Sequence, residues 1–288
     1  MPGSSASVRL DGSARLRQSL RRDQHALARH LSRLPGADEI DIHQFRVACR
    51  RLRSLLRTFQ PLLDEEAAVD YRRRLGRVAE LGGEVRELDV IAVLPELQQE
   101  PFVRALVRAR HVAVQKLRRR LAGERVAGQV QSVRAGLTSR ELGLRQGLPE
   151  SAVLRRVRRN WRRADELLAR RSRDPQALHA LRIRLKNCRY TLELVADVLP
   201  RNATALRHRL REAQQLLGDQ RDVAAAIQWL DRSDLPLPLR RQASSRLERR
   251  ERRLGRELGP ALQQLEQAGK RWERAVTRLL ERGPLDQS

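Results

Sequence analysis

Apolar residues recur at intervals of three and four along almost the whole chain, and no stretch alternates convincingly with a period of two. Because an α-helix has 3.6 residues per turn, this spacing places the apolar side chains on one helix face and predicts an all-α fold. We expect nine helices, over residues 13–34, 38–60, 64–94, 101–122, 150–172, 174–199, 201–231, 237–258 and 260–282.

One internal stretch departs from this periodicity. Residues 123–149 contain five glycines and few regularly spaced apolar positions, which is typical of a linker. We therefore expect a first helical half over 13–122 and a second over 150–282. Residues 1–12 are rich in serine, lack the apolar segment of a signal peptide, and are expected to form a disordered tail, as are residues 283–288.

The two halves contain an internal repeat. Ile-His-Gln-Phe-Arg-Val at 42–47 matches Leu-His-Ala-Leu-Arg-Ile at 178–183, at an offset of 136 residues. The same offset aligns Asp38 with Asp174, Arg50 with Lys186 and Arg53 with Arg189. Further on, a glycine-containing segment at 81–88 resembles the segment at 216–223. The order of segments is the same in both halves, which indicates a duplication.

The repeated helix carries a line of cations beside its apolar stripe. At about 100° per residue, the basic positions of the first copy fall within roughly 80° of arc and extend over about 21 Å. We call this line the first ladder, and it consists of His43, Arg46, Arg50, Arg53 and Arg57. The second ladder consists of His179, Arg182, Lys186 and Arg189.

These ladders are electrostatically unfavourable for an isolated protein. No acidic residue lies between positions 42 and 63, and like charges three and four residues apart destabilise a helix. The chain has 60 Lys+Arg against 35 Asp+Glu, a net charge of +25, and only three of the basic residues are lysines. Guanidinium groups grip phosphate oxygens bidentately. Because both halves retain this unfavourable repulsion between like charges, we expect a linear polyanion as the ligand, bound without catalysis.

The two ladder histidines lie near the first turn of their helices, where free backbone N–H groups favour anions. Further basic residues form less specific, secondary clusters that point in several directions. These are Arg72, Arg73, Lys116, Arg119, Arg120, Arg207, Arg211, Arg246, Arg249 and Arg253. Arg86 and Arg221 stand beside acidic residues, and we interpret both as partners in intramolecular ion pairs.

Cys49 and Cys188 occupy apolar helix positions without any C-x-x-C spacing, so we interpret them as core residues in a reducing compartment, the cytoplasm. No apolar run is long enough to span a membrane. The arginines beside His43 and His179 would repel a metal ion, and the cysteines lie on another helix face. We expect no metal site and no cofactor, and the sequence leaves the oligomeric state open.

The paired H-x-x-R-x-x-x-R/K-x-x-R pattern, at 43–53 and 179–189, resembles the CHAD family of histidine-containing α-helical domains. The resemblance extends over roughly residues 13–282. It implies two four-helix bundles related by a pseudo-twofold axis, with the basic ladders lining a central groove or pore. It also implies binding of inorganic polyphosphate and association with polyphosphate granules. Members are often fused to a triphosphate-tunnel (CYTH) domain, for which these 288 residues leave no room.

Two other functions compete with this one. Nucleic acid is the second candidate, because attraction to phosphate alone does not distinguish polymers and because the chain is unusually rich in arginine. Aromatic residues make up only 3% of the chain, which disfavours single-strand binding by stacking. A metal-dependent phosphohydrolase is the third candidate, since Glu80, Glu84 and Glu87 have the i,i+3 and i,i+4 spacing of Mg²⁺ ligands, as Asp219 and Asp222 do in the other half.

The binding function predicts that the protein releases no phosphate from polyphosphate or nucleotides with any divalent metal, because the carboxylates are expected to pair with nearby basic residues. Phosphate release can be measured with and without Mg²⁺. If phosphate release depends on a metal and Glu84→Gln abolishes it, a phosphohydrolase becomes the leading candidate function.

Overall fold

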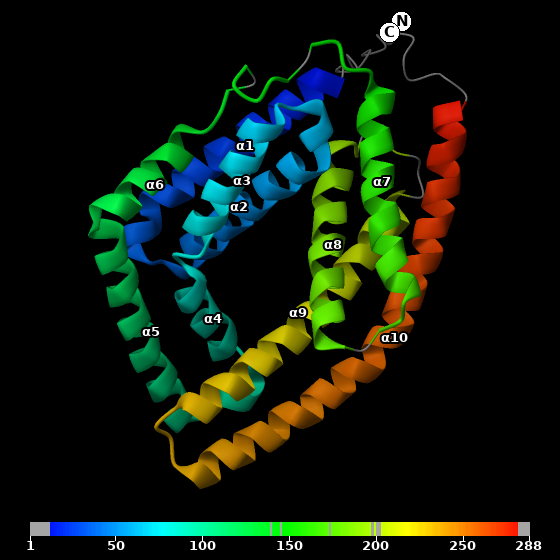
Figure 1. Cartoon of the computed structure of the whole chain (residues 1–288). Helices are drawn as coiled ribbons and strands as arrows, with labels where there is room; N and C mark the ends of the chain where they lie inside the picture. Colours follow the sequence, from blue (N-terminus) through cyan, green and yellow to red (C-terminus); the bar gives the residue numbers. More distant parts are fainter. Residues whose placement is uncertain are drawn as a thin grey trace, which may run out of the picture.

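The computed structural model describes residues 12–281 except 139, 145, 173, 197, 198 and 200–202. Over these residues the secondary structure is helical, with no strand, so the predicted all-α fold is confirmed. Both predicted tails lie outside the described residues, apart from Gly12, which begins the first helix. Figure 1 shows residues 12–135 on one side of the molecule and residues 150–194 on the other, with the helices of residues 203–281 running along the bottom between the two sides.

The first half consists of six α-helices and three short 3₁₀ turns within the described residues. They are α1 (Gly12–Arg33), η1 (Leu34–Gly36), α2 (Glu39–Phe59), η2 (Gln60–Leu62), α3 (Glu65–Ala79), α4 (Gly83–Ala92), η3 (Pro95–Leu97), α5 (Glu100–Ala122) and α6 (Glu124–Ala135). The described part of the second half has four helices, α7 (Glu150–Ala169), α8 (Pro175–Leu194), α9 (Ala203–Arg232) and α10 (Leu237–Glu281). Each ladder helix begins at an aspartate cap: Asp38 accepts hydrogen bonds from the N–H groups of Ile40 and Asp41, and Asp174 from that of Ala177.

Two predictions about helix boundaries in the first half were wrong. The single helix expected over 64–94 is broken into α3 and α4 around Gly82 and Gly83, since two consecutive glycines remove the helical preference. The linker expected over 123–149 contains α6, which follows α5 directly after an extended Gly123. Its glycines favour a linker, but Val126, Val130 and Val133 pack this short helix against the core.

The opposite error occurred in the second half, where a break was expected near residue 259. Gly259 and Pro260 lie inside the continuous helix α10. Proline removes one helical hydrogen bond, yet α10 packs along α9 and then along α7, and this packing outweighs the local preference. Gly218, which corresponds to Gly83 at the start of α4, likewise lies inside the continuous helix α9.

The packing of the helices repeats the duplication. In the second half α9 packs along α10, and in the first half the same pairing is divided between α3 with α6 and α4 with α5. The pairs α1–α2 and α7–α8 also correspond. Each half is therefore one version of a four-helix arrangement, with two of the four helices interrupted in the first.

The halves meet where α2 crosses α8. Ser54 Oγ donates a hydrogen bond to Asn187 Oδ1 over 2.6 Å. At the repeat offset of 136, Ser54 corresponds to Tyr190 and Asn187 to Arg51, and the Arg51 guanidinium lies 5.5 Å from the centroid of the Tyr190 ring. The contact and its counterpart both exist, so the crossing lies close to an approximate twofold axis. Ladder residues Arg50 and Lys186 flank this crossing.

Each half has a tightly packed core beneath its ladder helix. Cys49 and Cys188 are buried there, as predicted. In the second half the rings of Trp161 and Trp272 pack edge to face with centroids 6.4 Å apart. Gly269 makes room for them, because a Cβ atom at this position would lie 1.7 Å from Cζ2 of Trp161.

We predict that Gly269→Ala destabilises the protein by about 1–3 kcal/mol or more, because the added methyl group must displace a buried indole. Urea denaturation followed by circular dichroism measures the loss. Gly218→Ala is the matched control in another long helix, with no atom within 4 Å of the added Cβ. The control should gain a few tenths of a kcal/mol to about 1 kcal/mol from helix propensity. Equal stability of the two variants would contradict this packing.

Candidate basic groove

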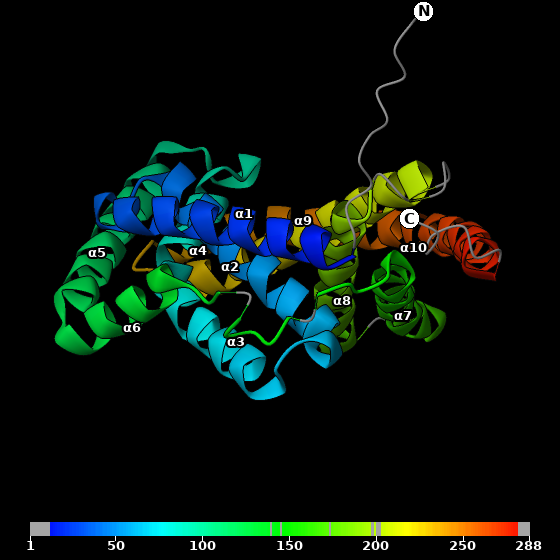
Figure 2. The same cartoon turned by 90° about the horizontal axis from the view of Figure 1, so that it is seen from above.

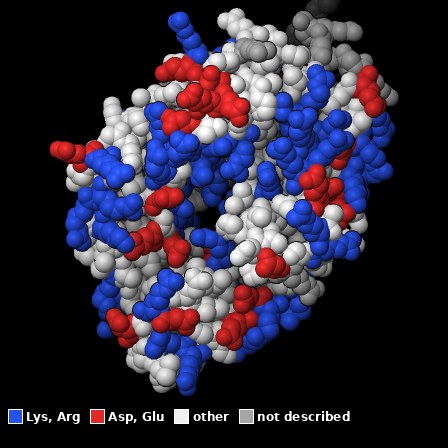
Figure 3. Space-filling view, in the orientation of Figure 1, with Lys and Arg blue, Asp and Glu red and all other residues white. Residues whose placement is uncertain are grey.

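The central feature of the molecule is an opening between the two halves. Figure 3 shows the surface hollowed near its centre, with Lys and Arg side chains gathered around the rim. The opening lies between the α2–α8 crossing and the place where α4 packs against α9 (Figure 1). Seen from above, the crossing helices occupy the middle of the molecule (Figure 2). The walls therefore come from both copies of the repeat.

The structure brings most of the two ladders together at this opening. Arg50 Nε donates to the hydroxyl of Tyr190 over 3.1 Å, so the first ladder is tied directly to the second ladder's helix. The Arg189 guanidinium lies 4.9 Å from the centroid of the same ring. All ladder residues except His179 are partly buried. His179 is exposed, so the two histidines that the sequence places in equivalent positions have different surroundings.

The break between α3 and α4 positions Arg46. Nη1 of Arg46 donates a hydrogen bond to the carbonyl of Ala79, the last residue of α3. Gly82 lies close to α2, since a Cβ there would lie 3.1 Å from Ile42 Cγ2 and 4.0 Å from Arg46 Cδ. The interruption of the helix thus leaves a carbonyl oxygen that orients a ladder arginine. Arg182, its counterpart, faces the uninterrupted helix α9.

Several ladder donors have no partner. The Nε atoms of Arg53, Arg182 and Arg189 are buried and make no hydrogen bond within the described part of the chain. Buried donors are nearly always satisfied in proteins, and leaving one unpaired costs about 1–3 kcal/mol. The Nε atoms of Arg240 and Arg250 on α10 are unpaired in the same way, so an unpaired Nε is not confined to the ladders. On the ladders these donors are available to an acceptor on a ligand.

The cations of the two ladders repel one another. Burial, followed by repulsion from Arg50 and Arg182, lowers the pKa of Lys186 to about 6. Burial also lowers the pKa of His43, and repulsion from Arg86 and Arg50 adds to the effect. The largest cause in each case is loss of hydration, and an anion in the groove would offset both causes.

A second group of cations lies at the end of α2. Burial lowers the pKa of Arg57, and Arg72, Arg53 and Arg184 lower it further. Arg72, from the secondary set, therefore stands beside the first ladder, and it also donates to Gln60 Oε1 over 3.0 Å. Arg184 was missed by the sequence analysis, because its counterpart in the first half is Ala48 and the repeat gives no signal.

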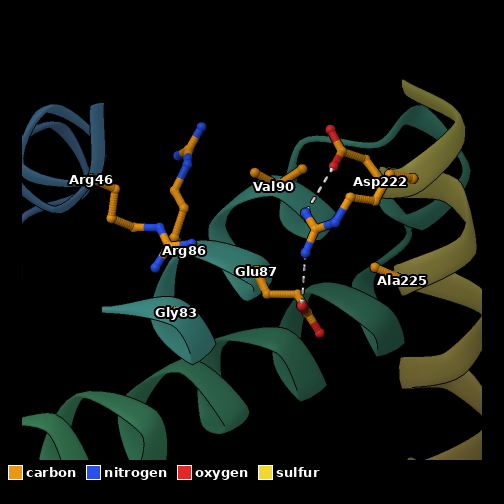
Figure 4. A pocket seen from close by; sticks show the side chains of 8 residues that line it. Arg46, Gly83, Arg86, Glu87, Val90, Asp222 and Ala225 are labelled. Atoms are coloured by element: carbon orange, nitrogen blue, oxygen red, sulfur yellow. Dashed lines mark ion pairs between the residues drawn. The ribbon is translucent and has the colours of Figure 1, made fainter. Parts of the chain in front are cut away.

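A small pocket adjoins the groove, with a cavity volume of about 40 Å³. Figure 4 shows Arg46 and Arg86 on one side of it and, on the other, dashed ion pairs that reach Glu87 and Asp222. Arg86 pairs with Glu39 at 2.8 Å, and Arg221 pairs with Glu87 at 3.6 Å and Asp222 at 3.8 Å. The predicted ion pairs are confirmed, and both arginines also line the pocket. Their alignment in the repeat could have identified them as site residues.

Most of the secondary basic residues point to solvent or to their own helices. Lys116 pairs with Glu84, Arg73 with Asp70 and Arg253 with Glu257. Three others bond to an acceptor one turn earlier, namely Arg119 to the Gln115 carbonyl, Arg211 to the Arg207 carbonyl and Arg249 to the Ser245 hydroxyl. Arg120 is exposed and Arg207 and Arg246 are partly buried. Among the secondary residues, Arg72 lies close enough to a ladder to lower the pKa of Arg57.

The carboxylates of the phosphohydrolase hypothesis are largely engaged. Glu84, Glu87 and Asp222 take part in ion pairs, and Asp219 accepts a hydrogen bond from Gln215 over 2.7 Å. Within the residues that the structure describes, no three His, Cys, Asp or Glu side chains gather as metal ligands do. In the same residues, no helix is apolar over a length that could cross a membrane.

The lowered pKa of Lys186 predicts a pH-dependent stability. In the unfolded chain this amine keeps its usual pKa of 10.5, so between pH 6 and 10.5 the unfolded state binds more protons than the native state. The native state is thus penalised increasingly as the pH falls toward 6. Lys186→Met should raise the midpoint of urea unfolding at pH 6, and the gain should shrink toward pH 10. A gain that does not change with pH would refute the assignment.

Comparisons with known proteins agree with this geometry. The sequence matches the CHAD domain family over residues 13–231. The fold is similar to the crystal structure of the CHAD domain from the plant Ricinus communis, with a TM-score of 0.66 and 20% identity, covering 94% of this chain and 96% of that chain. It is also similar to PptA from Streptomyces chartreusis, with a TM-score of 0.64 and 20% identity, covering 91% and 100% of the two chains.

No curated protein matches the sequence. The family match nevertheless covers three quarters of the chain and includes both ladders, and the structural similarity extends beyond it into α10. The expectation drawn from the H-x-x-R pattern is confirmed at the level of the family. The chain belongs to the CHAD domain family.

Proposed function

We propose that this protein binds inorganic polyphosphate, without catalysis, in the groove between its two ladders. The observation that carries the proposal is the set of buried, unpartnered Nε donors on Arg53, Arg182 and Arg189. They come from both repeats, on the two helices that cross beside the opening. A linear phosphate chain supplies anionic acceptors at every unit, so it can satisfy donors on both walls at once.

The groove favours a phosphate chain over a nucleic acid. Single-stranded nucleic acid is usually held by exposed aromatic rings on which bases stack. Phe45, Phe59 and Trp272 are buried in the core, and Tyr190 is buried beneath Arg51 and Arg189. A polymer without bases loses nothing from the lack of stacking surfaces. Nucleic acid remains the alternative that the binding experiments must exclude.

The absence of catalysis is part of the proposal. The carboxylates nearest the groove, Glu87 and Asp222, are both paired with Arg221. A phosphohydrolase would need such groups free to bind Mg²⁺. A binding protein of this kind would act in the cytoplasm, at polyphosphate granules.

The test of the function is charge reversal in each ladder. The first-ladder variant changes Arg46, Arg50 and Arg53 to Glu, and the second-ladder variant changes Arg182, Lys186 and Arg189 to Glu. Each should weaken binding of long-chain polyphosphate by about 100-fold and flatten its salt dependence, because fewer counterions are released. Short oligophosphates should lose less, because they do not gain from spanning both ladders. Calorimetry gives the affinities.

A matched control distinguishes position from total charge. Arg249, Arg252 and Arg256 are exposed on α10, at the edge of the molecule away from the opening. Their reversal to Glu makes the same change in net charge and should alter affinity little. Circular dichroism must show unchanged helical content in every variant, and the corresponding Gln variants replace any that misfold. If all three variants lose the same affinity for polyphosphate, binding depends on total charge and the site assignment is wrong.

A further inference from the structure

A line of arginines on α7 has no role in the groove described above. Arg156, Arg159 and Arg163 are spaced by three and four residues and fall within roughly 60° of arc, over about 10 Å. They make no ion pair or hydrogen bond to any described residue. Burial and repulsion from the other two lower the pKa of Arg156. The cations therefore repel one another without compensation.

The neighbouring arginines of α7 behave differently. Arg158 donates to the Thr277 hydroxyl and Arg162 pairs with Glu273, so this side of the helix is bound to α10. The unpaired line lies on the other side of α7, away from α10. Figure 3 shows Lys and Arg side chains covering the surface over α7 on the face that also bears the central opening.

Arg184 lies between the first ladder and the arginine line on α7. It lies one helical turn before Cys188, whose thiol donates to the Asn160 carbonyl of α7 over 3.4 Å, so Arg184 stands on the side of α8 that faces α7. On its other side it is close enough to Arg57 to lower the pKa of that ladder residue. The cations therefore continue from the end of the first ladder through Arg184 toward α7, which packs directly on α2 and α8.

The first half has no such extension. Buried leucines align α1 with α7 at an offset of 137, where Leu20 and Leu27 correspond to Val157 and Ala164. The positions that carry the unpaired arginines in α7 are then Ser19, Arg22 and Ala26 in α1, and Arg22 is engaged by Asp23. The duplication does not account for the line on α7, because it would have produced one on α1 as well.

We propose that Arg184 and the α7 line, Arg156, Arg159 and Arg163, form a one-sided extension of the groove that holds the part of a long phosphate chain projecting beyond the ladders. This rests on the proposed polyphosphate function and adds to it a direction and a dependence on chain length. A chain that fits within the groove does not reach α7. A longer chain makes the additional contacts at high effective concentration.

The test is reversal of Arg156, Arg159 and Arg163 to Glu, with polyphosphate of two lengths as the probe. Affinity for long-chain polyphosphate should fall by about tenfold, and the salt slope should decrease by about 2 if each contact releases counterions as for a single-stranded nucleic acid. Affinity for tripolyphosphate should not change. The control is again the α10 triple at Arg249, Arg252 and Arg256, which has the same three- and four-residue spacing.

Each outcome decides the proposal. Unchanged affinity for both lengths, equal loss for both, or an equal loss in the α10 control would overturn the extension while leaving the ladder groove intact. An effect confined to single-stranded DNA would assign α7 to a nucleic acid and also overturn it. A wild-type protein that binds neither polyphosphate would contradict the proposed function itself. Arg159 and Arg163 are exposed whereas Arg156 is partly buried, so Arg159→Gln with Arg163→Gln gives a milder second variant that leaves the partly buried side chain in place.

Discussion

Repulsion between the cations that α2 and α8 bring together is the constraint on which this structure depends. Two helices that each carry a line of basic residues cross close to the lines themselves, with Arg50 and Lys186 beside the crossing. Such proximity is unfavourable in a medium of low dielectric constant. It is tolerated because each ladder helix is anchored on its other face by a close-packed core. Stability is thus supplied by the core and lost at the groove, as expected for a site built for a ligand.

Specific contacts hold the crossing against this repulsion. Ser54 and Asn187 share a short hydrogen bond, and Arg51 reaches away from the groove to Glu193 at 2.8 Å and Asp23 at 3.2 Å. Arg51 is thereby neutralised, whereas the ladder arginines form no ion pair with any acidic residue that the structure describes. The distinction between paired structural arginines and unpaired groove arginines follows from which helix face each occupies.

The sequence predicted the fold class from its periodicity and the duplication from the offset of 136 residues, whereas the groove was implied by the resemblance to the CHAD family. It failed where tertiary packing overrides local preference, as at Gly259 and Pro260 inside α10. It also failed at α6, whose glycines suggested a linker. Arg184 and the α7 line escaped notice because neither is repeated, and nothing in a single helix pattern shows which arginines will find acidic partners on other helices. The exposure of His179 could not be foreseen, because it depends on which helices pack around the start of α8.

The central claim is that a phosphate chain, and not any polyanion, fits the groove between the ladders. Competition binding at about 150 mM salt tests it most directly, since general electrostatic attraction is then strongly screened. Long-chain polyphosphate should displace single-stranded DNA, double-stranded DNA, RNA and heparin at concentrations far below those needed for the reverse. Displacement of polyphosphate by any of these polymers at an equal concentration of charges would contradict the account.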